Sequence, residues 1–132
     1  MAPPRNPFQY GIVRVVPDIA RGEFVNAGVI VLCRPRRFLA ARTALDAARL
    51  AAIAPALDPA EVQPHLDAIE RIAAGDPDGG PIARLGLAER FHWLVAPAST
   101  IIQVSEVHTG LCHDPADELE HLFGMLVASP GH

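Results

Sequence analysis

A chain of 132 residues, half of them apolar and a fifth charged, has the composition of one globular domain and not that of a disordered segment. No apolar run approaches the roughly 20 residues of a membrane-spanning helix, and the start lacks the apolar stretch of a signal peptide, so we expect a cytoplasmic protein with no membrane contact. The net charge of -4 divides unevenly, because residues 1–49 carry eight arginines and three acids whereas residues 50–132 carry three arginines and twelve acids.

The first third of the chain predicts an antiparallel meander. Residues 1–7 contain three prolines, so we expect a flexible arm before the domain. Residues 8–16 and 24–33 are rich in β-branched side chains and predict two strands. After the short turn RPR, residues 38–42 can pair as a third strand.

The middle and the end of the chain predict helices. Apolar residues at helical spacing indicate helices near residues 46–57, 59–74 and 114–127, and the last two begin with aspartate and proline, which is typical of a helix start. Pro64 removes one hydrogen bond inside the second helix, so we expect a bend or a late start there. Residues 75–81, GDPDGGP, predict a loop that is too short to separate two domains.

A late strand completes the prediction. Residues 100–107 are rich in β-branched side chains, and the segment HTGLCH that follows is interpreted as a loop. These elements together predict a single α+β domain with one core, in which a mainly antiparallel sheet is covered by about three helices.

Polar residues that the strand and helix patterns leave unexplained gather around this late strand. In a strand over residues 100–107, Gln103 shares one face with Ser105, while His108 and Thr109 stand at the end, where loops often carry functional groups. The other members of the group precede or begin the strand: Arg90, His92, Trp93 and Thr100. The alternative is that these side chains only form a solvated surface.

The meander contributes two further candidates for binding. Arg14 interrupts an otherwise apolar strand face and needs either a partner or solvent. Asn26 lies inside an apolar run, where it is either a core amide with satisfied hydrogen bonds or a ligand contact.

The sequence offers no recognisable cofactor site. Five residues of types that zinc accepts lie close together in the sequence, namely His108, Cys112, His113, Asp114 and His121, but no second ligand pair occurs at zinc spacing, so we expect no metal. The chain also lacks a phosphate-binding P-loop, a dinucleotide-binding glycine pattern and a nucleophile elbow. The two cysteines, Cys33 and Cys112, are expected to be reduced thiols.

Four segments, YGIVRVVP, GEFVNAGVIVLC, RFHWLVAPASTIIQ and HTGLCHDPADELEHLF, together and in this order resemble a bacterial family known as domain of unknown function 3037. The resemblance covers roughly residues 9–127. It implies no activity and no catalytic residues. It also implies neighbours similar to HipA-type kinases, and hence a protein partner.

Three functional hypotheses remain open. The leading one is a small accessory module that binds another protein, because no catalytic signature is present. The alternative is a hydrolytic or phosphodiester-directed enzyme that uses Arg90, His92 and His108 around a pocket anchored by Arg14 and Asn26. The third is weak nucleic-acid binding through the arginine-rich first half of the chain.

Overall fold

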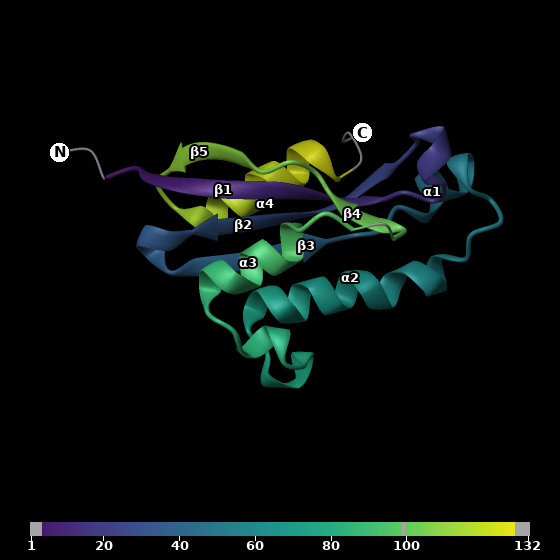
Figure 1. Ribbon diagram of the computed structural model, residues 1–132. Helices are drawn as coiled ribbons and strands as arrows, with labels where there is room; N and C mark the ends of the chain where they lie inside the picture. Colours follow the sequence, from purple (N-terminus) through teal and green to yellow (C-terminus); the bar gives the residue numbers. More distant parts are fainter. Residues whose placement is uncertain (1–3, 99, 129–132) are drawn as a thin grey trace.

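The computed structural model describes residues 4–98 and 100–128, and its centre is one antiparallel sheet (Figure 1). The strand order is β3-β2-β1-β4, with β5 also paired to β1. Strand β1 is therefore flanked on one side by β2 and on the other by two short strands, β5 along its first half and β4 along its second. The strands are β1 (Asn6–Val15), β2 (Val25–Cys33), β3 (Phe38–Thr43), β4 (Ile102–Val104) and β5 (His108–Cys112).

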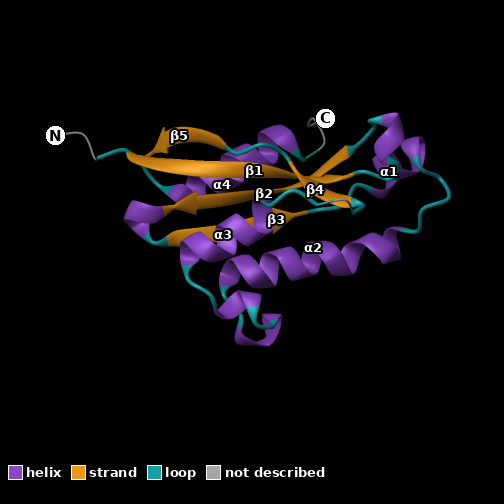
Figure 2. Ribbon diagram, viewed as in Figure 1, coloured by secondary structure: helices purple, strands orange, loops and turns teal. Residues whose placement is uncertain are grey.

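Helices cover both faces of the sheet (Figure 2). The four helices are α1 (Ala47–Ile53), α2 (Pro59–Ala74), α3 (Leu87–Val95) and α4 (Pro115–Leu126). The expected aspartate-proline starts of α2 and α4 are confirmed, because the carboxylates of Asp58 and Asp114 accept hydrogen bonds from backbone N–H groups of the first turn. The predicted α+β class and antiparallel meander are confirmed as well.

The apolar interior consists of two clusters, one on each face of the sheet, and not of the single core expected from the sequence. We call the cluster beneath α2 and α3 the first cluster; it includes Leu50, Leu66 and Phe91. The second cluster lies beneath α4 and includes Val31 and Phe123. The sheet separates them because side chains alternate between its faces, so β1 and β2 each contribute buried residues to both clusters.

Several boundaries differ from the sequence prediction. Strand β1 begins at Asn6, so the expected arm is shorter than residues 1–7; residues 1–3 lie outside the described residues. Pro7, which pairs with Leu111, is tolerated there because it lies at the beginning of the strand, where a missing N–H group does not interrupt the sheet. The segment HTGLCH was expected to be a loop, but its first five residues form β5. The first half of β1 has a free edge, and residues 108–112 form a strand because they pair with that edge, although their short sequence has only a weak strand pattern.

The helical region also differs in detail. Helix α2 begins at Pro59 and contains Pro64, so the expected late start is wrong. The carbonyl group left without an intrahelical donor belongs to Ala60, which is exposed and therefore accessible to water. The loop over residues 75–81 contains a short 3-10 turn, Pro77–Gly79. Within the described ranges, no helix has the length and apolar character needed to cross a membrane.

Candidate functional site

An apolar groove lies between α2 and the edge of the sheet formed by β4. Its volume is about 440 Å³. Buried residues of both helices, Ile69, Ile72 and Leu94, form part of its lining. Trp93 on α3 also lines the groove, and 51% of its surface is exposed. A half-exposed tryptophan beside an apolar hollow is a feature of surfaces that bind other molecules.

The backbone of β4 offers free hydrogen-bonding groups beside this groove. The Val16 N–H donates to the Ile101 carbonyl (2.7 Å) and the Ser105 N–H to the Ile12 carbonyl (2.9 Å). Because hydrogen bonds alternate along an antiparallel pair, Gln103 faces β1 while the N–H and C=O groups of Ile102 and Val104 point away from it.

Among these outward groups of β4, the Ile102 carbonyl is already engaged by the chain itself. It accepts a hydrogen bond of 2.6 Å from the Thr100 hydroxyl. Within the described part of the sheet, no strand pairs with the outer side of β4. The N–H groups of Ile102 and Val104 and the Val104 carbonyl bond to none of the residues described, so they are available to an added chain.

Three of the residues singled out from the sequence line this one groove: Trp93, Thr100 and Gln103. The Gln103 side chain donates to the Thr100 carbonyl over 3.1 Å, which holds the segment before β4 against the strand. The structure thus brings together three candidates that come from a helix, a loop and a strand.

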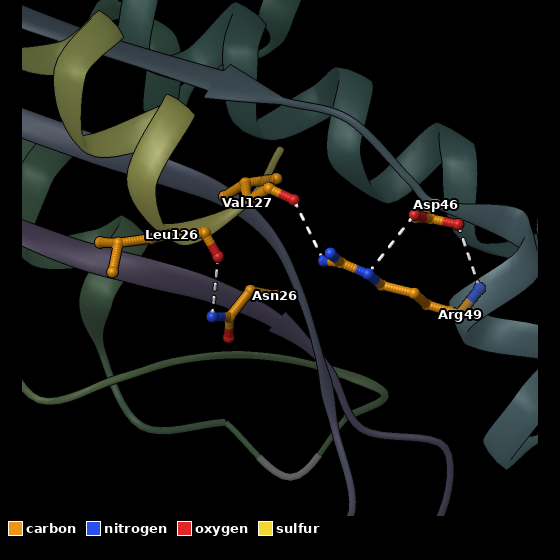
Figure 3. Close-up of polar contacts among 5 residues, drawn as sticks. All are labelled: Asn26, Asp46, Arg49, Leu126 and Val127. Atoms are coloured by element: carbon orange, nitrogen blue, oxygen red, sulfur yellow. Dashed lines mark hydrogen bonds and ion pairs between the residues drawn. The ribbon is translucent and has the colours of Figure 1, made fainter. Parts of the chain in front are cut away.

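Arg14 and Asn26 lie together elsewhere, as cross-strand partners on β1 and β2. The Asn26 side chain donates to the carbonyl of Leu126 (3.1 Å), and Arg49 of α1 donates to the carbonyl of Val127 (3.2 Å), as Figure 3 shows. Carbonyl groups at the end of a helix have no partner within the helix, so these two side chains supply the hydrogen-bond donors that the last carbonyl groups of α4 need. The amide nitrogen of Asn26 therefore has a structural role, while its buried oxygen Oδ1 has no hydrogen-bond partner among the described residues.

Arg14 is held by an aromatic ring. Its guanidinium lies 4.3 Å from the centre of the Phe24 ring, and within the part of the chain that the structure describes its buried Nε has no hydrogen-bond partner. Phe24, Asn26 and Arg49 also line a shallow pocket of about 400 Å³ beside α1. Arg14 is not among the residues lining this pocket.

Arg90 links two helices and does not reach a cavity with the candidate histidines. Its guanidinium donates to the carbonyl of Leu85 (2.7 Å) and to that of Ala73 (3.4 Å), so it joins the end of α2 to the start of α3. His92 is exposed on the surface of α3.

His108 lies on the opposite face of the sheet from α3. Its ring stacks on that of Tyr10 at 5.1 Å between centres, and Tyr10 packs against the second cluster. Its neighbour Thr109 is exposed on β5. The structure therefore separates His108 from Arg90 and His92, and these residues do not form the shared pocket that the enzyme hypothesis requires.

The cysteines are buried free thiols in the second cluster. Removal from water and the nearby Cys33 raise the pKa of the Cys112 thiol to about 11. Its thiol is therefore protonated at neutral pH, which makes it a poor nucleophile. Around the start of α4, where a metal site was weighed from the sequence, no three potential ligands converge among the described residues.

The raised pKa of Cys112 predicts a loss of stability in alkaline solution. The folded chain binds this proton more tightly than the unfolded chain, whose thiol has its usual pKa near 9.0. The contribution is fully present below pH 9 and is lost as the pH rises through 11, so the free energy of unfolding should fall between these values. Urea unfolding across this range measures the fall. In Cys112→Ala the fall should be smaller, and an unchanged slope in that variant would contradict the assignment.

Comparison with known proteins gives one match. A family model described as "Protein of unknown function (DUF3037)" matches residues 10–127, nearly the whole chain, which confirms the resemblance noted from the sequence. No curated protein and no solved structure matches the chain.

Proposed function

As a member of the DUF3037 family of proteins of unknown function, this chain has no activity assigned by its relatives, and we propose that it is a small accessory module that binds another protein in the bacterial cytoplasm. The bound element is an extended segment of the partner, which adds to the sheet along β4.

The unpaired edge of β4 beside an apolar groove is the observation that supports this proposal. A peptide that pairs with an exposed strand gains affinity from backbone hydrogen bonds and specificity from pockets that take alternate side chains. Here the outward N–H groups of Ile102 and Val104 can donate the backbone hydrogen bonds, and the groove along α2 can take the side chains. Trp93 stands at the groove as an exposed aromatic anchor.

The first partner to test is a HipA-type kinase, which the family resemblance implies. A HipA-type kinase from the same organism and the 132-residue chain would be purified separately, and their affinity would be measured by titration calorimetry. Trp93→Ala should weaken binding by about 30-fold, because truncating a central interface tryptophan costs about 2 kcal/mol or more. His92→Ala is the matched control, since His92 is an exposed aromatic neighbour on the same helix that does not line the groove.

Hydrogen exchange tests the strand pairing itself. The amides of Ile102 and Val104 should exchange quickly in the free chain and be protected in the complex, since a paired strand would occupy their N–H groups. A complex in which both amides stay unprotected, or in which Trp93→Ala and His92→Ala bind equally well, would overturn the groove as the binding site. The absence of any complex would overturn the kinase as the partner.

A further inference from the structure

A second surface with a defined chemistry lies at the turn between β2 and β3. Residues 34–37, RPRR, form this turn, and all four are exposed; we call it the basic turn. The turn lies beside the first half of β1, whereas β4 lies along the second half (Figure 1). The groove is lined by residues of β4. The two surfaces are therefore separate.

The charges of the basic turn are not neutralised by the fold. Ion pairs within residues 4–98 and 100–128 involve the guanidinium groups of Arg21, Arg42 and Arg49, and none involves the turn. The guanidinium of Arg36 donates a hydrogen bond of 2.9 Å to the carbonyl of His113. This acceptor is neutral, so the bond does not cancel the charge of the guanidinium. Unpaired cations clustered on four residues attract an anionic group of a partner.

The backbone of the turn shows that an arginine occupies a position better suited to glycine. Arg37 has a φ of 50°, in the left-handed region, and it is the one residue other than glycine with a positive φ among those described. A side chain with a Cβ is less stable in this region than glycine, especially one that lacks the local hydrogen bonds of asparagine or aspartate. A binding role for the guanidinium explains why the turn carries arginine there.

A small apolar hollow adjoins the turn. Its volume is about 190 Å³, and Pro7, Leu32, Arg34 and Pro35 are among the residues that line it. This is smaller than the roughly 300–1,000 Å³ of sites for small organic ligands, so it suits a single aliphatic side chain. Cations next to a hollow of this size match a short peptide in which carboxylates flank one apolar residue.

We propose that the basic turn and its hollow bind an acidic segment of a protein that carries one aliphatic side chain among its carboxylates. A nucleic acid fits less well, because the start of α4 lies beside the turn through the Arg36–His113 contact and carries Asp114, Asp117 and Glu118. These acids would repel an extended phosphate backbone but leave room for a short peptide. This site does not depend on the groove along β4.

Fluorescence anisotropy with the 132-residue chain tests the proposal. The probe is a short labelled peptide of glutamates around a central leucine, compared at low salt with the same peptide carrying serine in place of leucine and with a labelled oligothymidylate. The leucine peptide should bind most tightly, and its affinity should fall as salt is added. Trp93→Ala should bind it as the unmodified chain does, which separates this site from the groove.

Two double variants with the same net charge test whether the basic turn itself is the binding site. Arg34→Ala with Arg37→Gly should weaken binding of the leucine peptide by at least about tenfold. Arg71→Ala with Arg84→Ala removes the same charge from α2 and from the turn before α3, and it should leave the affinity nearly unchanged. Arg37→Gly alone should weaken binding without lowering the melting temperature, because glycine suits the positive φ. Equal losses in the two double variants, oligothymidylate binding as tight as that of the leucine peptide, or no peptide binding at all would each overturn the proposal.

Discussion

Replacing Phe91 with alanine should lower the free energy of unfolding by about 3–5 kcal/mol, the usual cost of truncating a buried phenylalanine. Phe91 is 1% exposed and lies in the first cluster, where α3 packs on the sheet. The substitution removes its contacts and leaves a cavity that the surrounding strands fill only partly. Urea unfolding followed by circular dichroism measures the change at constant slope.

Trp93→Ala is the comparison for Phe91→Ala, because it removes a larger aromatic side chain from the same helix. With 51% of its surface exposed, Trp93 lies at the groove and outside both clusters. Its loss should change the free energy of unfolding by under about 1 kcal/mol, as for most surface substitutions. Equal losses of stability in the two variants would contradict the position of Trp93 outside the core.

Gly28→Ala should destabilise the fold by about 2 kcal/mol or more, although it adds only one methyl group. Gly28 lies on β2 opposite Val13 and Thr43, in the interior of the sheet. A Cβ there would lie 2.9 Å from the Arg42 carbonyl oxygen and 3.3 Å from the Thr43 Cα. Both atoms belong to the backbone of the paired strand, so relief requires movement of β3. The free energy of unfolding measures the effect.

The matched control is Gly124→Ala, the same substitution in α4. A Cβ at Gly124 meets nothing within 4 Å, so the methyl group enters open space. Alanine is favoured over glycine in a helix, and this variant should gain up to about 1 kcal/mol of stability. If the free energy of unfolding falls in Gly28→Ala and rises in Gly124→Ala, the loss at Gly28 is due to the close approach of strands β2 and β3 and not to a general effect of removing glycine. A gain in stability at Gly28 would contradict the strand spacing.

Local sequence patterns predicted correctly those helix starts that depend on interactions between residues close in the sequence. The acid-proline pairs at Asp58 and Asp114 marked two helix starts correctly, since a capping carboxylate bonds to N–H groups two or three residues away. Strand β5 was missed because its pairing with β1 joins residues about a hundred positions apart, and a five-residue segment with a central glycine has a weak strand pattern of its own.

The candidate site was predicted in part. Trp93, Thr100 and Gln103 were selected as polar or aromatic residues that the helix and strand patterns did not explain, and the structure places them at one groove. The groove itself depends on α2 lying beside β4, a tertiary contact with no local signal. Arg90 and His92 are near His108 in the sequence but lie across the sheet from it, because the chain passes from α3 through β4 to β5.

The position of β1 has a consequence for synthesis on the ribosome. This strand is made before the strands that pair with it, yet one of its two sides is completed only by residues 102–112, which are made after α1, α2 and α3. Until then the nascent meander exposes an unpaired backbone that other nascent chains or chaperones can contact. Productive folding must therefore wait for the closing strands, and pairing across such a separation is slow.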